Sequence, residues 1–311
     1  MDREVKPMTR RDTRAASSVR PGFGFRVAVI AVALLGGAVV SYPQASPWIA
    51  SVIQSGQISE YETGVSELDP EVRAELLAAA HEYNENLPNG PLRDPYVLNE
   101  SGEAVSLEAG REEYEAMLAP EGAEPDAPVA RVSIPSIGVD LPIFLGTSEE
   151  TLSRGVGHLY GSGLPVGGEG VHSVLTAHSG YVESTLFDDL PKVEIGDTFT
   201  IDVLGEVLTY RVDQIETTLP DESQLLRQVP GKDYVTLVTC TPRYVNTHRL
   251  LVRAERIPTP DSGDAADGGE IETAGPGFPW WLFTALGPAL VAAFALRPRR
   301  DERAAPDPAD S

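Results

Sequence analysis

The sequence is poor in cysteine, lysine and positive charge. Its 311 residues include one cysteine, Cys240, which excludes an intramolecular disulfide and the zinc and iron–sulfur sites that need several cysteines. Only three of the 24 basic residues are lysines, and 47 acidic residues give a formal charge of −23. Because phosphate binding needs a basic surface, nucleic acid is excluded as the main partner. A hydrophobic content of 41% still permits a packed core.

Two long uncharged runs lie near the ends of the chain. The first, residues 27–42, follows seven basic residues among the first 26, and with the preceding aromatic residues it forms about 20 residues, enough to span a bilayer. We interpret this run as a retained signal anchor, with a cleaved signal peptide as the alternative. The second run, residues 278–296, has tryptophans at one edge and arginines directly after it, which favours a transmembrane helix over a buried soluble helix.

The distribution of basic residues predicts the topology. They lie before the first run and after the second, so the positive-inside rule places the tails 1–26 and 297–311 in the cytoplasm. Residues 43–277 are then expected outside the cell membrane. Since structural cysteines outside the cell usually pair, a single cysteine there indicates a reactive thiol.

The part between the two runs changes from helical to β-rich patterns. Residues 43–127 are expected to be helical, with a helix start at Asp69-Pro70 and a second short helix over residues 106–118. An acidic Gly/Pro-rich linker is expected over 258–277. Between the helical region and the linker, residues 128–257 show the period-two pattern of strands.

The strands of this β-rich region are predicted from alternating and β-branched residues. They cover residues 129–134, 138–145, 171–177, 197–204, 207–216, 233–239 and 248–257, and the run around 156–160 is a candidate eighth strand. A tight turn at Gly205-Glu206 is expected to join two of them. Seven or eight strands in about 130 residues favour a mainly β fold with a closed barrel.

Three polar residues at predicted strand ends are candidates for chemistry. Cys240 follows one strand and precedes a loop, where an exposed, rigidly held thiol suits a nucleophile; a buried, inert cysteine fits the local sequence equally well. His178 ends another strand, and only pairing with the thiol distinguishes it from a structural histidine. Arg249 opens the last strand. A hairpin would bring it beside Cys240 to stabilise an oxyanion, the alternative being a surface ion pair.

These residues lie in stretches that resemble a known family. TLVTC at 236–240 resembles the TLxTC signature of sortases, LTAH at 175–178 resembles the sortase strand that ends in the catalytic histidine, and NTHRLLVR at 246–253 resembles the strand that carries the essential arginine. The resemblance covers residues 128–257 and is closest to the class C, pilin-polymerising branch. It implies an eight-stranded sortase-type β-barrel, with N-terminal helices and two transmembrane helices.

The same resemblance implies a cysteine transpeptidase that needs no metal or cofactor. Cys240 would attack the Thr–Gly carbonyl of an LPxTG-type sorting signal, His178 would act as acid and then base, and Arg249 would hold the oxyanion. The expected partners are the membrane, LPxTG-bearing pilins or surface proteins, and an amine from a pilin lysine. A wall-anchoring sortase that uses a peptidoglycan amine is one alternative. A surface protein that is itself a sortase substrate is another, but no LPxTG precedes residue 278.

Asp94, Pro95 and Tyr96 resemble the lid of class C enzymes, in which the acid pairs with the catalytic arginine and the ring covers the thiol. The sequence departs from the family at two places expected to lie at the edge of the cleft. Ser179 stands where arginine is common, and Arg243-Tyr244-Val245 stands where Tyr-Gly-Ile is common. These departures leave the substrate preference more open than the chemistry.

Overall fold

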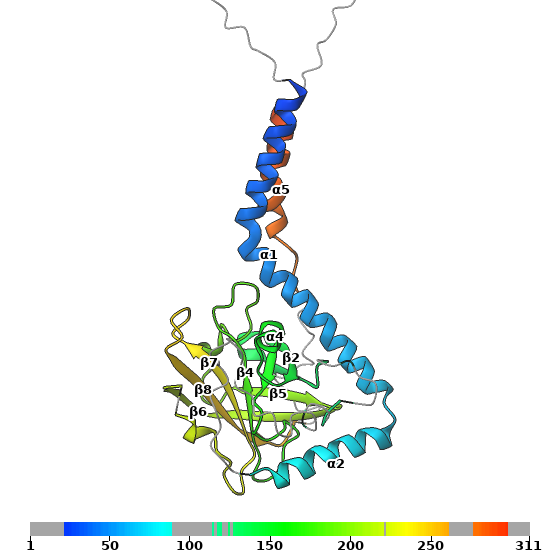
Figure 1. Ribbon diagram of the computed structural model, residues 1–311, viewed down its shortest axis with the longest axis vertical. Helices are drawn as coiled ribbons and strands as arrows, with labels where there is room; N and C mark the ends of the chain where they lie inside the picture. Colours follow the sequence, from blue (N-terminus) through cyan, green and yellow to red (C-terminus); the bar gives the residue numbers. More distant parts are fainter. Residues whose placement is uncertain are drawn as a thin grey trace, which may run out of the picture. The chain divides into compact units, whose positions relative to one another are not determined.

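The computed structural model describes residues 22–88, 114, 117–119, 124, 127–220, 222–260 and 276–297 (Figure 1). The chain forms two compact units. One comprises Met1–Tyr42 and Trp280–Ser311, and the other comprises Pro43–Pro279. The short helix predicted over 106–118 falls outside the described residues, except for Tyr114, Met117 and Leu118. The predicted lid at Asp94, Pro95 and Tyr96 also falls outside them.

Helices occupy both predicted hydrophobic runs. Helix α1 spans Phe23–Glu67, contains Pro43 and Pro47, and is the one described helix that is long and apolar enough to cross a membrane. Helix α5, Trp281–Ala295, has 15 residues, which is short for a bilayer of about 30 Å. Length and composition therefore support the first predicted transmembrane helix, whereas the second is not confirmed.

Within the first unit, α1 and α5 approach closely at small residues. Gly37 packs on the Ala285 carbonyl so tightly that an added Cβ would lie 2.2 Å from its oxygen. One turn later, Ser41 Oγ lies 2.7 Å from Thr284 Oγ1. Only glycine fits at position 37, and small residues of this kind are typical of helix contacts in membranes.

Helix α2, Pro70–Asn86, begins as the sequence predicts. The side chain of Asp69 accepts a hydrogen bond from the Glu71 backbone N–H at 2.8 Å, and Pro70 occupies the first turn, where its missing N–H costs nothing. Ala80 is fully buried. Asn84 exchanges two hydrogen bonds with the backbone of Leu164, of 3.1 and 2.7 Å. These contacts fix α2 against the β-rich part of the same unit.

The predicted closed β-barrel is confirmed. Its strands are β1 Ala130–Ile134, β2 Val139–Leu145, β3 Val156–His158, β4 His172–Thr176, β5 Thr198–Val203, β6 Glu206–Thr218, β7 Tyr234–Thr241 and β8 His248–Ile257. The order around the barrel is β1-β2-β3-β4-β7-β8-β6-β5. Strands β2 and β3 pair in parallel, as do β4 and β7, and the other pairs are antiparallel. The candidate eighth strand is therefore confirmed and corresponds to β3.

The turn between β5 and β6 is one residue earlier than predicted. Val203 pairs with Glu206, so Leu204 and Gly205 form the turn and Glu206 belongs to the strand. Both turn residues have positive φ, 48° and 79°, as a two-residue hairpin turn requires. The sequence pattern favoured Gly205 as the first turn residue because leucine rarely adopts this conformation.

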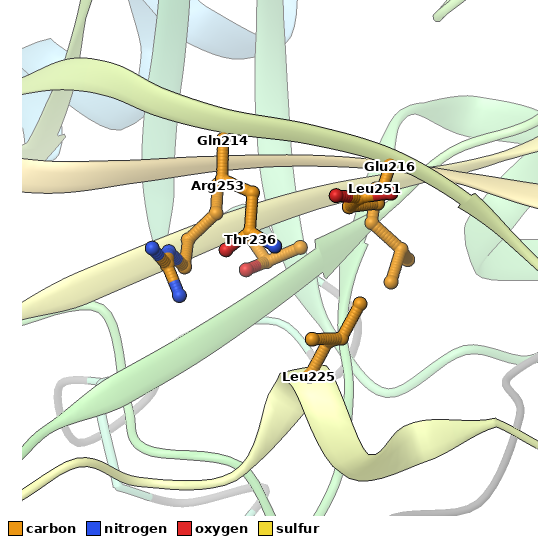
Figure 2. A pocket seen from close by; sticks show the side chains of 6 residues that line it. All are labelled: Gln214, Glu216, Leu225, Thr236, Leu251 and Arg253. Atoms are coloured by element: carbon orange, nitrogen blue, oxygen red, sulfur yellow. The ribbon is translucent and has the colours of Figure 1, made fainter.

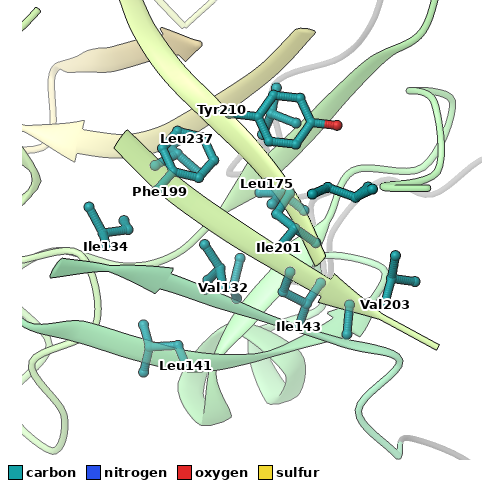
Figure 3. Close-up of a cluster of buried hydrophobic side chains, with 14 of the residues drawn as sticks. Val132, Ile134, Leu141, Ile143, Leu175, Phe199, Ile201, Val203, Tyr210 and Leu237 are labelled. Carbon is teal, nitrogen blue, oxygen red and sulfur yellow. The ribbon is translucent and has the colours of Figure 1, made fainter. Parts of the chain in front are cut away.

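The alternation of side chains gives strands β4, β7 and β8 two distinct faces. Their inner face carries Leu175, Leu237 and Val252, which join the large buried cluster of the barrel (Figure 3). Their outer face carries Val174, Val238 and Leu251, which form a smaller buried cluster with Leu159 and Leu226. Leu226 belongs to the short helix η3, Ser223–Leu226, between β6 and β7. Strands buried on both faces hold their side chains rigidly, and the candidate residues lie at one end of them.

Candidate active site

The register of three neighbouring strands brings Cys240, His178 and Arg249 together. Cys240 of β7 is directly opposite Arg249 of β8. Thr176 of β4 is opposite Val238 of β7 in a parallel pair, so His178, two residues later, reaches the level of Cys240. The hydrogen bond from Ala177 N to Val238 O, at 3.2 Å, continues the pairing past the end of β4. By alternation all three side chains belong to the outer face.

Cys240 is buried, which is one of the two alternatives that the sequence left open. It is 7% exposed, because it lies within β7 rather than after it, with β4 and β8 on either side. Its carbonyl oxygen accepts a hydrogen bond from Ser179 Oγ at 2.9 Å. On the preceding residue, Thr239 Oγ1 donates to Ala177 O at 2.7 Å. Both bonds tie the end of β4 to β7 at the level of the thiol.

His178 lies between two residues that the sequence did not point to. Its ring stacks on Tyr181, with centroids 5.4 Å apart and planes at 13°. Its Nε2 is 3.4 Å from Oε2 of Glu149. Glu149 is in the first turn of helix α4, Glu149–Arg154, which Ser148 caps by accepting from Thr151 N. The capping signal could have located this helix in the sequence, but nothing local indicates that its first turn meets His178.

Arg249 is buried rather than at the surface. It is 8% exposed, and its Nη1 donates to the carbonyl oxygens of Asn246 and His248, each at 3.1 Å. Asn246 lies in the exposed loop 242–247 between β7 and β8, where Tyr244 and Asn246 have φ of 67° and 60°. The guanidinium therefore takes its position from the loop as well as from the strand.

A pocket lies on the outer face beyond the three residues (Figure 2). Its lining consists of Gln214, Glu216, Leu225, Thr236, Leu251 and Arg253. Thr236 is on the same face of β7 as Cys240, four residues away, and Figure 2 shows Leu225 of η3 pointing toward Leu251. The pocket thus extends the outer face away from the thiol, between η3 and strands β6, β7 and β8.

Arg253 has a structural role in this wall. It forms an ion pair with Asp213 at 2.8 Å and lies 4.4 Å from the centre of the Tyr234 ring. Hydrogen bonding to Asp213 is the main reason that the pKa of Arg253 is raised. Arg253 is therefore held in place by Asp213 and Tyr234 as part of the pocket wall.

Two other histidines are buried, neutral parts of the scaffold. His172 bridges Thr236 Oγ1, at 2.7 Å, and the carbonyl of Arg227, at 2.8 Å. His158 contacts the Tyr114 hydroxyl and the Gly163 carbonyl, both at 2.7 Å. Burial lowers the pKa of each imidazole to about 4, so neither is charged near neutral pH. Across the described ranges, no group of three or more His, Cys, Asp or Glu residues is arranged to hold a metal ion.

The closed eight-stranded barrel is that of a sortase-type protein. Residues 132–257 match the family of the Sortase domain. Among solved structures, sortase C-1 from Actinomyces oris is 44% identical, covers 60% of this chain and 99% of its own, and has a TM-score of 0.55. Sortase A from Corynebacterium diphtheriae is 42% identical, with 68% and 96% covered and a TM-score of 0.59. The chain therefore belongs to the sortase family.

Other relatives agree on the family. The structure of Streptococcus pneumoniae sortase C is 39% identical, covers 65% of this chain and 96% of its own, and has a TM-score of 0.57. The curated Sortase A from Streptococcus agalactiae serotype III (strain NEM316) is 30% identical over 130 residues, 41% of this chain and 52% of that protein. The matches span about half the length of such curated relatives. The prediction that this chain belongs to the sortase family of cysteine transpeptidases is confirmed, and sortase C structures are among its neighbours.

Proposed function

We propose that this protein is a membrane-anchored cysteine transpeptidase that cleaves an LPxTG-type sorting signal between Thr and Gly and joins the threonine to an amine. The observation that carries the proposal is the alignment of Cys240, His178 and Arg249 at one level of three adjacent strands. Helix α1 supplies the anchor, and residues 278–296 supply a second. Both termini lie in the cytoplasm, and residues 128–257 form the extracellular catalytic domain.

In the first step, the Cys240 thiolate attacks the threonine carbonyl carbon. The negative charge that develops on the carbonyl oxygen is stabilised by Arg249, whose guanidinium is held on the neighbouring strand. The bond from threonine to glycine then breaks, and His178 gives a proton to the leaving glycine amine. The threonine remains bound to Cys240 as a thioester.

In the second step, an amine attacks the thioester carbonyl. His178 accepts a proton from this amine, the carbon–sulfur bond breaks, and the Cys240 thiolate is restored. A lysine amine of a pilin subunit would give an isopeptide bond and so a polymer. Likeness to sortase C-1 from Actinomyces oris and to Streptococcus pneumoniae sortase C supports this choice.

A wall-anchoring role, with a peptidoglycan amine as nucleophile, is the second candidate. It is favoured by the departures from the class C pattern at the edge of the cleft, Ser179 and Arg243-Tyr244-Val245. The two roles differ only in the amine. Offering the purified full chain an LPxTG peptide with equal amounts of a pilin lysine peptide and a peptidoglycan stem peptide separates them, because mass spectrometry identifies the joined product.

The reaction itself is tested with Cys240→Ala in the full-length chain. We expect this variant to lose both thioester formation and peptide joining, and hydroxylamine to release a threonine hydroxamate only from the wild type. Thr198→Ala, at an exposed position of β5, is the control and should retain activity. Peptide joining by Cys240→Ala would rule out covalent catalysis by this residue.

The lid remains part of the proposal. Asp94 of the lid Asp94-Pro95-Tyr96 would neutralise Arg249, and Tyr96 would exclude water and substrate from the thiol. If so, Asp94→Ala should increase the rate at which iodoacetamide alkylates Cys240. An unchanged rate would count against gating by this segment.

A further inference from the structure

The carboxylate of Asp188 connects two loops beside the candidate site. Its side chain is 8% exposed. Its Oδ1 accepts a hydrogen bond from the Gly180 backbone N–H at 2.5 Å. Its Oδ2 pairs with the Arg243 guanidinium. Gly180 lies two residues after His178, whereas Arg243 lies in the loop 242–247 that follows Cys240 and leads to Arg249.

The two loops are in direct contact where Asp188 joins them. Gly180 has a φ of +76°, and an added Cβ would lie 3.0 Å from both Arg243 Cγ and the Tyr244 ring. A side chain at position 180 would therefore be strained and would also push the loops apart. Another bond closes the first loop on itself, from Phe187 N to His178 O at 3.1 Å. The backbone of His178 is thus held from the same side as Asp188.

The far end of the loop 242–247 holds the guanidinium of Arg249. Its Asn246 carbonyl accepts a hydrogen bond from Arg249 Nη1 at 3.1 Å. Contacts therefore run from the backbone of His178 through Gly180, Asp188 and Arg243 to Arg249. Strand pairing fixes the backbones at Cys240, His178 and Arg249. His178 and Arg249 lie at strand ends, where the loop that follows His178 or precedes Arg249 decides the direction of the side chain.

We propose that Asp188 is a positioning residue for transpeptidation, which through Gly180 and Arg243 fixes the two loops that orient His178 and Arg249 about the thiol of Cys240. This inference rests on the proposed function, since it concerns the geometry of the same reaction. Asp188 need not touch the substrate. A displacement of about 1 Å among reacting groups can cost about 100-fold in rate, so a link of this kind is expected to appear in kcat.

The chemistry of the link requires a carboxylate. Asp188 accepts from a backbone N–H on one oxygen and from a guanidinium on the other. Burial raises the pKa of this carboxyl, and the Gly180 N–H and the Arg243 guanidinium oppose that effect by stabilising the ionised form. An asparagine has nearly the same shape but only one acceptor oxygen. Asp188→Asn must therefore lose one of the two contacts while leaving the packing in place.

The test compares Asp188→Asn with Asp189→Asn in the full chain. Asp189 is the adjacent residue, carries the same charge, and pairs with Lys192 at 2.9 Å on the exposed side. Joining of an LPxTG peptide to an amine is measured with each variant. We expect Asp188→Asn to lower kcat about 10- to 100-fold, with a smaller change in the KM of the sorting peptide. Asp189→Asn should behave as the wild type.

Arg243 provides a second variant that changes an exposed side chain and so spares the core. Arg243→Ala should reproduce the loss in kcat, and Arg243→Lys should recover part of it because the charge is kept. The double variant Asp188→Asn/Arg243→Ala should be no slower than the worse single variant, since both remove one link. Additive losses, or wild-type kcat in Asp188→Asn, would overturn the proposal.

A separate readout distinguishes this proposal from the proposed function. Amide hydrogen exchange of residues 178–181 and 242–247 should increase in Asp188→Asn and Arg243→Ala but not in Asp189→Asn. If the wild type joins no peptide to any amine, the proposed function fails, whatever the exchange shows. If the wild type is active and neither exchange nor kcat changes in Asp188→Asn, the positioning role alone fails.

Discussion

The inner and outer faces of β4, β7 and β8 use the same backbone ladder for different purposes. On the inner face, Leu175, Leu237 and Val252 are fully buried in the barrel cluster. On the outer face, the apolar residues give way at one end to a thiol, an imidazole and a guanidinium. Because side chains alternate along a strand, adjacent residues belong to different faces. Leu237 and Cys240, three residues apart, therefore lie on opposite sides of the sheet.

Within a single strand, the residues of the inner face therefore affect stability, and the residues at the end of the outer face affect the chemistry. Inner residues gain free energy from burial and close packing, and their loss leaves a cavity. Outer residues at the strand end contribute little apolar area. Their contribution to the chemistry depends on how their side chains are directed relative to one another. Substitutions on the two faces should therefore act on different measurable quantities.

The largest effect on stability is expected for Leu237→Ala. Its side chain is fully buried in the barrel cluster, so truncation should lower the free energy of unfolding by about 2–5 kcal/mol. Denaturant unfolding measures the change. Cys240→Ala, on the outer face of the same strand, should change this free energy by less than about 1 kcal/mol. Similar losses for the two variants would break the comparison between the faces.

The next effect concerns activity and is expected for Arg249→Lys. Lysine keeps the charge but lacks the planar fork that donates to the Asn246 and His248 carbonyls. We expect kcat/KM for peptide joining to fall about 100- to 1,000-fold, as for the loss of an oxyanion donor. Arg211→Lys, at an exposed position of β6, should leave it unchanged. A lysine variant as active as the wild type would show that charge alone suffices.

A third effect concerns a histidine on the outer face of β4. His172, at the start of the strand, is buried and its pKa is lowered to about 4. An unfolded histidine has a pKa of about 6.5, so between these values the unfolded chain binds more protons. The stability that neutral His172 contributes is therefore present above about pH 6.5 and is lost as the pH falls toward 4.

The loss through His172 amounts to roughly 3 kcal/mol across this pH range. The free energy of unfolding, measured by denaturant titration from pH 7 to 4, should decline less steeply in His172→Gln than in the wild type. His81→Gln, on helix α2, serves as the control. A slope unchanged by His172→Gln would show that this residue takes up no proton on unfolding in that range.

Local sequence patterns predicted the strands because period-two alternation and β-branching are properties of adjacent residues. They also predicted the candidate residues, since Cys240, His178 and Arg249 lie in short motifs. The local sequence left open whether Cys240 is exposed or buried, because its burial depends on β4, β8 and the loops around the thiol rather than on β7 alone. Contacts of His178 with Glu149 and of Asp188 with Arg243 join distant segments, and no local pattern reports them.

The structure gives the contacts of the residues at the two places where the sequence departs from the family pattern. Ser179 donates to the carbonyl of Cys240, and Arg243 pairs with Asp188. Both contacts connect the chain after His178 with the end of β7 or the loop that follows it. The sequence indicated that the cleft edge was unusual, but the partner of each side chain is set by folding.

The smallest effect is expected where the two faces meet, at Thr239. Its backbone adjoins Cys240, it is fully buried, and its Oγ1 donates to Ala177 O at 2.7 Å. Thr239→Val keeps the shape but removes this bond, which should cost about 1 kcal/mol of stability. Because Ala177 precedes His178, the same change should lower kcat a few-fold. Leu237→Ala should leave kcat unchanged at denaturant concentrations at which both variants are folded. Parallel unfolding and joining assays check this. A stability loss without any change in kcat would place Thr239 wholly with the inner face.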